Sequence, residues 1–160
     1  GLAWGALAAT VVVLAAAVPA SRPLFRDRRM AGVGARGTAW CAAVRIPFGT
    51  VVLEEVAFRG VLAALGVPAA VSATLFGLWH VRPTAKTLGT NRITRRRTRA
   101  AALAAAVVAT AVAGFGLSLL RTASGGLLAP AIVHVAITST ATVASFVAFA
   151  RYRRATWVSP

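Results

Sequence analysis

The chain has 160 residues, of which 58% are hydrophobic and 13% are charged, and its formal net charge is +15. Soluble domains are typically about 45–50% apolar and about 25% charged, so this composition argues against a soluble globular protein. The single cysteine, Cys41, excludes a disulfide within this sequence.

Five apolar segments follow one another along the chain and predict an all-α, multi-pass transmembrane helical bundle. They cover residues 2–20, 38–66, 68–81, 100–121 and 127–150. No basic stretch precedes the first segment, so we expect a helix of the mature protein rather than a signal peptide. The second contains Pro47, which predicts a kink or a split near that residue.

The third apolar segment, 68–81, is the shortest of the five. It opens on Pro68, a favourable first-turn residue. Its length spans only about 21 Å, which is compatible with a re-entrant segment or with one that borders a water-filled cavity. We expect the basic stretches 21–37 and 82–99 to be loops, the second of them mobile, and residues 1–160 to form a single membrane domain.

The positive charge is concentrated in three clusters, which contain 15 of the 18 basic residues. Five lie in 21–37, seven in 82–99 and three after residue 150. Five successive crossings would place all three clusters on one side, with only Arg121 in the opposite connections. By the positive-inside rule, this predicts a multi-pass cell-membrane protein with cytoplasmic basic loops and tail. The expected partners are lipids of the anionic cytoplasmic leaflet, and no nucleic acid.

Few titratable side chains remain inside the apolar segments. They are Arg45, Glu54, Glu55, Arg59, His80 and His134. Such residues normally face the interior of a helix bundle and mark function. Glu55 and Arg59 are four positions apart and can form an ion pair, whereas Glu54 is rotated by about 100° and points elsewhere. Arg45 lies near the cytoplasmic end of its segment and is expected to extend its charge to the interface.

The helical rise places three of these groups at comparable depths. Glu54 and His80 each lie about 18 Å in from the outer ends of their segments. His134 lies about 10 Å in, and helix tilt can close the difference. One carboxylate and two imidazoles can therefore converge near mid-membrane, as an acid–base site requires.

Each of these residues also has a purely structural interpretation. The acidic pair and its arginine can tie helices together as an ion cluster, and His80 can form an interfacial pair with Trp79. For His134 the alternative is helix packing, and for Thr138 it is a hydroxyl bonded back to its own helix. Phe76 is expected to pack rather than take part in chemistry.

Three short motifs occur in order on the apolar segments. EEVAFR at 54–59 fits EExxxR, FGLWH at 76–80 fits FxxxH, and HVAIT at 134–138 is similar to HxxxN with threonine in the last place. Together they resemble the motifs of the CPBP family of CAAX prenyl endopeptidases and bacteriocin-processing enzymes, also called the ABI family. The resemblance covers about residues 40–150.

This resemblance implies an all-helical intramembrane protease with a glutamate base and no covalent intermediate. Glu54 would activate a water with help from His80. Glu55 would pair with Arg59 to shape the site. The histidine and the threonine of the third motif, His134 and Thr138, would stabilise the oxyanion. The predicted function is hydrolysis of a membrane-associated peptide or protein, and no cofactor is expected.

Three other functions are compatible with the same residues. A non-proteolytic membrane scaffold or bacteriocin-immunity-type protein of the same family would need the polar cluster only to hold helices together. A zinc site of Glu54, His80 and His134 ranks lower because the sequence has no HExxH motif. A proton-coupled transporter would be expected to show repeat symmetry, which the sequence lacks.

The sequence leaves the substrate and the assembly open. A prenylated CAAX tail, a bacteriocin leader and another membrane peptide all fit the predicted site. Five helices would form a fuller groove as a homo-oligomer. The preference for arginine over lysine, together with the alanine-rich helices, hints at a bacterial source.

Overall fold

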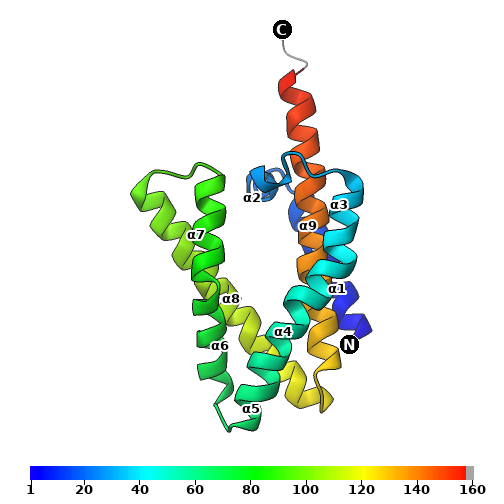
Figure 1. Cartoon of the computed structure of the whole chain (residues 1–160), viewed down its shortest axis with the longest axis vertical. Coiled ribbons are helices and arrows are strands. Elements are labelled where there is room, and N and C mark those ends of the chain that lie inside the picture. The colour runs from blue at the N-terminus through cyan, green and yellow to red at the C-terminus, as the bar shows by residue number, and fades with distance from the viewer. Residues whose placement is uncertain (158–160) are drawn as a thin grey trace. The chain divides into compact units, whose positions relative to one another are not determined.

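The computed structural model describes the backbone of residues 1–157, and its regular elements are all helices (Figure 1). In chain order they are α1 (Leu2–Ala17), α2 (Arg22–Phe25), η1 (Arg28–Met30), α3 (Ala35–Trp40), η2 (Cys41–Arg45), η3 (Pro47–Val51), α4 (Val52–Glu55), η4 (Val56–Val61), α5 (Leu62–Ala64), α6 (Ala69–Trp79), α7 (Val81–Thr90), α8 (Arg96–Ser124) and α9 (Leu128–Trp157). The all-α prediction is confirmed for the described residues. The side chains of Pro23, Thr156 and Trp157 are left out of the description.

Contacts within the chain gather into two compact units, which are described separately. The first unit contains Gly1–Val52 and α9 from Ile132 onward, and the second contains Leu53–Ala131. That both belong to one membrane domain stays a prediction.

In the first unit, α1 packs closely against α9. A Cβ added to Gly5 would lie 3.0 Å from Ile132 Cγ2 and 3.7 Å from the Ala136 Cβ, so glycine permits the close approach. The segment η2 is tied to the same helix, because Ser139 Oγ donates to the carbonyl of Ala42 at 2.7 Å. Helix α9 therefore organises this unit.

At Pro47, where a kink or a split was predicted, the structure has a π-helical segment within a continuous helical run. From Ala35 to Ala64 the backbone stays helical, and Pro47 stands at the start of the wider π-helical segment η3. The preceding residue, Ile46, keeps helical dihedrals of φ −68° and ψ −54°. π-Helical turns absorb disruptions of the normal hydrogen-bond ladder, and they are frequent at functional sites.

In the second unit, α6 crosses α8 at very short range. A Cβ on Gly77 would lie 2.7 Å from the carbonyl oxygen of Val107, so only glycine fits there. Ser72 on the same helix donates to the carbonyl of Phe58 at 2.8 Å, which joins α6 to η4. The buried ring of Phe76 lies between these elements.

The expectation of a loop over 82–99 is wrong, because most of this stretch is helical. Residues Val81–Thr90 form α7, and residues 96–99 already belong to α8. Leu88 is buried, and Arg99 Nη2 donates to the carbonyl of Ala85 at 3.2 Å, which holds the two helices together. Residues 21–37 likewise contain the short helices α2 and η1 and the start of α3. The sequence prediction missed these helices because it placed helices only in apolar segments, and both stretches are highly charged.

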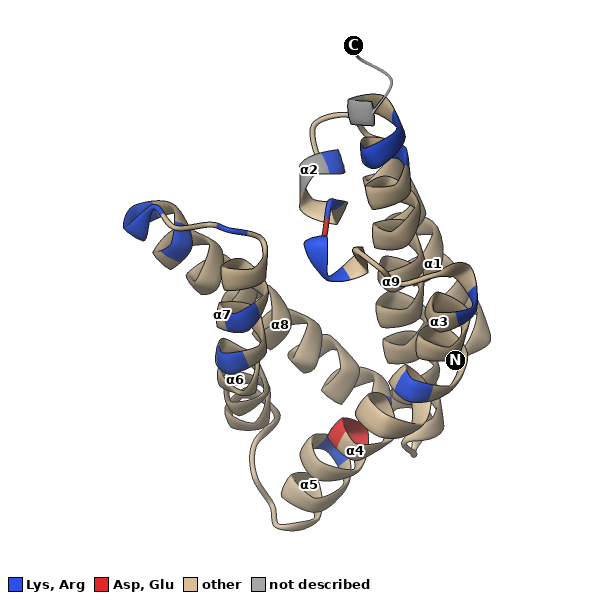
Figure 2. Cartoon of the chain, turned by 45° about the horizontal axis from the view of Figure 1, so that its top comes forward, with Lys and Arg blue, Asp and Glu red and all other residues tan. Residues whose placement is uncertain are grey.

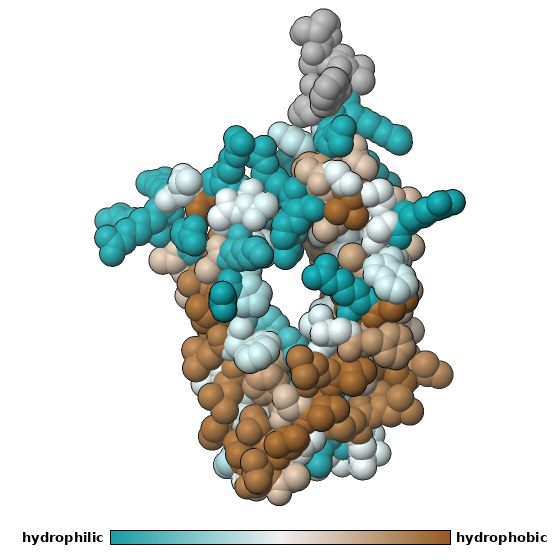
Figure 3. Space-filling view, viewed as in Figure 1, coloured by the Kyte–Doolittle hydropathy of each residue, from teal (hydrophilic) through white to brown (hydrophobic). Residues whose placement is uncertain are grey.

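Two described helices are long and apolar enough to cross a membrane, by length and composition: Arg96–Ser124 and Leu128–Ala155. The helix Leu2–Ala17 is apolar but shorter. Five crossings therefore stay a prediction. In the second unit, large apolar side chains of α6 are exposed, and Figure 3 shows the outer surface of α6 and α5 as hydrophobic. An exposed apolar surface of this kind suits lipid contact.

Candidate active site

Three charged side chains are buried within two turns of one helical run. Glu54 and Glu55 lie on α4, and Arg59 follows on η4. Figure 2 shows the acidic residues of α4 in red. Glu55 and Arg59 are each 1% exposed, and Glu54 is 6% exposed. Burying such charges is costly unless each is paired or hydrogen-bonded, so their partners decide what they can do.

Arg59 is held from three directions. Its Nη1 donates to Glu55 Oε1 at 3.1 Å, and its Nη2 donates to the carbonyl of Gly114 at 3.1 Å. The guanidinium carbon lies 4.2 Å from the centroid of the Phe76 ring, in cation–π geometry. A Cβ on Gly114 would lie 2.8 Å from Phe76 Cδ1, so glycine makes room for this stack. The charge of Glu55 is thereby balanced by an immobilised cation.

Glu54 has a different kind of partner. The indole Nε1 of Trp79 donates to Glu54 Oε1 at 3.1 Å. This hydrogen bond orients the carboxylate. The Trp79 ring also packs against Phe58, with ring centroids 6.1 Å apart, so its position is supported by the core of the unit.

His80 follows Trp79 directly and caps α6. Its Nδ1 lies 2.7 Å from the carbonyl oxygen of Phe76, and its ring lies 4.6 Å from the Phe76 ring. Because a carbonyl can only accept, this bond assigns the Nδ1 proton. In the neutral imidazole, Nε2 is then the acceptor. The ring is half-buried.

The third motif lies on α9, in the other unit. His134 is buried, with 6% exposure. Thr138 Oγ1 donates to the carbonyl of His134 at 2.6 Å, one turn earlier on the same helix. The threonine proton is thus engaged by its own helix, as is common for this residue type.

The second unit brings together the first two motifs, with Glu54, Glu55, Arg59 and His80 on adjoining elements. His134 and Thr138 are described within the first unit, and their predicted convergence with the others stays a prediction. The Phe76 side chain packs, as expected.

Two partners in this site were missed from the sequence. Trp79 was considered only as an interfacial partner of His80 but donates to Glu54, and the Gly114 carbonyl accepts from Arg59. Trp79 adjoins His80 within the FGLWH motif, which is a signal that could have identified it. Nothing in the sequence marks Gly114.

A family model described as type II CAAX prenyl endopeptidase Rce1-like matches residues 36–140. The chain belongs to this family. The matched range contains all three motifs, and the resemblance to CAAX prenyl endopeptidases stated from them is confirmed. No curated protein and no solved structure matches the chain.

The Rce1-like family is a family of membrane-embedded CAAX proteases, so membership is consistent with a peptidase, and the two long apolar helices are consistent with a membrane protein. Residues 1–157 contain no group of three or more His, Cys, Asp or Glu side chains that could hold a metal ion.

Proposed function

We propose that this Rce1-like protein is an intramembrane endopeptidase that hydrolyses a membrane-associated peptide with a water activated by Glu54. One observation carries the proposal: the two adjacent glutamates have partners of different kinds. Glu55 forms an ion pair with the immobilised Arg59, whereas Glu54 is oriented by the indole of Trp79. The first arrangement builds structure, and the second orients the carboxylate that we assign as the base.

His80, which directly follows the Trp79 that binds Glu54, supplies a second acceptor. With Nδ1–H donated to the Phe76 carbonyl, Nε2 can accept a proton from water. A water shared by Glu54 and Nε2 of His80 would direct both its hydrogens to acceptors and its lone pair to a carbonyl carbon. Such a water must lie within about 3 Å of both groups.

The reaction follows from these roles. Glu54 removes a proton from the water as the oxygen attacks the peptide carbonyl, which gives a tetrahedral oxyanion. The C–N bond then breaks, and Glu54 returns the proton to the leaving amine, so one water is consumed per peptide bond. We assign stabilisation of the oxyanion to His134, a donor that can be worth about 3–4 kcal/mol. Thr138 keeps its hydroxyl on the His134 carbonyl and supports that turn.

We further propose a multi-pass location in the cell membrane, with the basic segments on the cytoplasmic side and in contact with anionic lipids. The substrate is a peptide or protein at the bilayer. Because the family is described by its CAAX prenyl endopeptidases, a prenylated CAAX peptide is the first substrate to test.

Glu54→Gln tests the proposal. The amide oxygen can still accept from Trp79, so the variant should fold with an unchanged Tm, yet it cannot take a proton. Cleavage of a fluorescent prenylated CAAX peptide by the purified full chain should fall by at least about 10²-fold, the lower end of the usual acid–base contribution. Arg45→Gln, which removes an exposed charge of the same apolar segment, should leave cleavage unchanged. Cleavage retained in Glu54→Gln would overturn the proposal.

The same preparation tests the zinc alternative. Under the glutamate mechanism, cleavage should survive prolonged chelation, and elemental analysis should find no stoichiometric metal. Loss of cleavage on chelation, with recovery on adding Zn²⁺, would replace this mechanism by a metal-dependent one.

A further inference from the structure

A groove of about 590 Å³ runs along α9 on the side that faces α1. Its floor is formed by small and branched apolar side chains, among them Val13 and Ala16 of α1 and Val143, Val147 and Ala148 of α9. All the lining residues belong to the first unit. The volume lies within the usual range of small-molecule sites, about 300–1,000 Å³.

One end of this groove is strongly basic. Arg22, Arg26 and Arg151 line it together with Tyr152. Arg22 Nη2 donates to the carbonyl of Ala17 at 3.1 Å, which holds it at the end of α1. The guanidinium carbon of Arg26 lies 5.0 Å from the centroid of the Tyr152 ring. Two of the three cations are thus ordered at the rim by contacts with uncharged groups.

Neither ion pair described within residues 1–157 includes one of these three arginines. The sequence has three acidic residues, and the described ion pairs join Asp27 to Arg29 and Glu55 to Arg59. An apolar channel that ends in three guanidinium groups is complementary to an amphiphile with an apolar tail and an anionic head.

We infer that this groove binds one anionic phospholipid, with the phosphate against Arg22, Arg26 and Arg151 and an acyl chain along the apolar floor between α1 and α9. No residue of the glutamate and histidine motifs is among those that line this groove, and the inference does not depend on peptidase activity. It also differs from general attraction to an anionic leaflet, because it requires particular arginines and an open floor.

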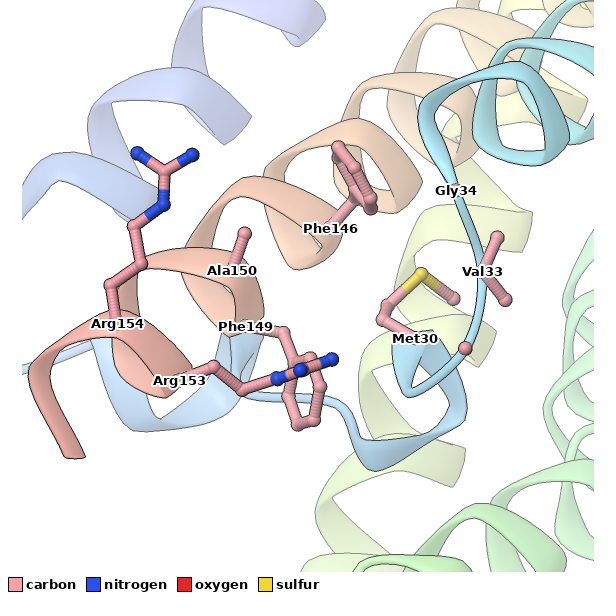
Figure 4. A pocket seen from close by; sticks show the side chains of 9 residues that line it. Met30, Val33, Gly34, Phe146, Phe149, Ala150, Arg153 and Arg154 are labelled. Carbon is pink, nitrogen blue, oxygen red and sulfur yellow. The ribbon is translucent and has the colours of Figure 1, made fainter. Parts of the chain in front are cut away.

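The neighbouring surface of α9 supplies matched controls. A second cavity, of about 470 Å³, lies between α9 and the segment 30–34, and it is lined by Phe146, Phe149, Ala150, Arg153 and Arg154 (Figure 4). These two arginines stand within three residues of Arg151 but line a different cavity. Arg36, exposed near the start of α3, completes a control set of three charges.

The charge test compares two triple variants of the full chain in detergent. One is Arg22→Gln/Arg26→Gln/Arg151→Gln, and the other is Arg36→Gln/Arg153→Gln/Arg154→Gln. Native mass spectrometry measures binding of phosphatidylglycerol and of phosphatidylcholine with identical acyl chains. We expect the wild type to prefer phosphatidylglycerol by about tenfold, since each basic side chain adds appreciable attraction to an anionic headgroup. The first variant should lose this preference, and the control should keep it within about twofold.

The floor test changes shape without changing charge. Ala148→Phe fills the groove and should reduce phosphatidylglycerol binding by about tenfold, whereas Ala150→Phe enters the other cavity and should not. Glycerophosphate, which has the phosphate but no acyl chain, should not compete.

Three results would overturn the inference. They are equal loss of the preference in both triple variants, equal affinity of the wild type for the two lipids, and effective competition by glycerophosphate. Circular dichroism and Tm identify any variant that fails to fold. Single Arg26→Gln and Arg151→Gln variants then repeat the comparison against single Arg153→Gln.

Discussion

Adjacent residues of the same type are given different tasks by their neighbours. Glu54 and Glu55 share a sequence environment, but a step of about 100° around the helix directs them to different elements. Glu55 meets a guanidinium fixed by the Gly114 carbonyl and the Phe76 ring, whereas Glu54 meets the indole of Trp79. A buried ion pair of this kind adds little to the free energy of folding, but removing one partner is strongly destabilising. We therefore interpret Arg59 and Glu55 as a structural pair that positions the site.

Trp79→Phe removes the hydrogen bond to Glu54 and keeps an aromatic ring against Phe58. A hydrogen bond to a charged group is worth about 1.5–3 kcal/mol, so kcat should fall by about 10- to 100-fold as the carboxylate loses its orientation. KM should stay unchanged because the indole is assigned no contact with substrate. Trp40→Phe, an exposed position on α3, is the control for losing an indole. Equal kcat values for both variants would remove Trp79 from the site.

Thr138→Val tests the choice between the helix bond and an oxyanion role. Because the hydroxyl donates to the His134 carbonyl, its removal should change kcat by less than about threefold. Loss of an oxyanion donor would instead cost about 10²–10³ in kcat. Steady-state cleavage by the purified variant measures the change in kcat. A loss of about 10²–10³-fold would mean that the Thr138 hydroxyl stabilises the oxyanion.

Spacing along one helix predicted the residues of this site better than it predicted their partners. The four-residue separation of Glu55 and Arg59 indicated the pair, because it depends only on helical geometry. Trp79 lies 25 residues from Glu54, and Gly114 lies 55 residues from Arg59. Contacts between residues so far apart depend on how the helices cross, and the spacing of residues in one sequence does not predict these crossings.

At the scale of elements, close helix crossings depend on small residues. Helix α6 approaches α8 where Gly77 faces Val107 and Ala111, and the Gly114 position accommodates Phe76 and Arg59. In membranes such close packing replaces much of the hydrophobic driving force available in water. The close contact at Gly77 lies in the last turn of α6, just before Trp79 and the C-cap residue His80.

Gly77→Ala should disrupt this crossing. Its Cβ would lie 2.7 Å from the Val107 carbonyl oxygen and 2.9 Å from the Ala111 Cβ, so one helix must shift. We expect a loss of about 1–3 kcal/mol in the free energy of unfolding, measured by SDS titration in mixed micelles. Gly116→Ala on α8 meets nothing within 4 Å and should be neutral or stabilising by up to about 1 kcal/mol. Equal stability of the two variants would contradict the importance of the crossing.

At the scale of the whole molecule, composition predicted helices and a membrane, but the apolar blocks did not give the helix lengths. The block 68–81 folds as α6 over Ala69–Trp79, and the block 38–66 is interrupted by π-helical segments. Conversely, α8 and α9 extend past their apolar blocks into basic sequence. Hydropathy identifies the residues that can contact lipid, but it does not locate the ends of helices. Those depend on capping residues such as Gly125, which adopts a left-handed conformation with φ 70° at the end of α8.

The orientation of α8 offers a direct test of the predicted threading. Its 29 residues extend about 43 Å, which exceeds the hydrocarbon thickness of about 30 Å. Thr90 lies before it in the basic stretch, and Ser124 ends it; both are exposed. The positive-inside rule therefore predicts Thr90 in the cytoplasm and Ser124 outside.

Single cysteines report on this orientation once Cys41 is replaced by alanine. In intact cells, a membrane-impermeant maleimide should label Ser124→Cys, whereas Thr90→Cys should react only after permeabilisation. Labelling of both positions without permeabilisation would mean that α8 does not cross the membrane. Labelling of Thr90→Cys alone would mean that the basic clusters face outward. The proposed cytoplasmic location of the basic segments, including the arginines of the lipid groove, would then be wrong.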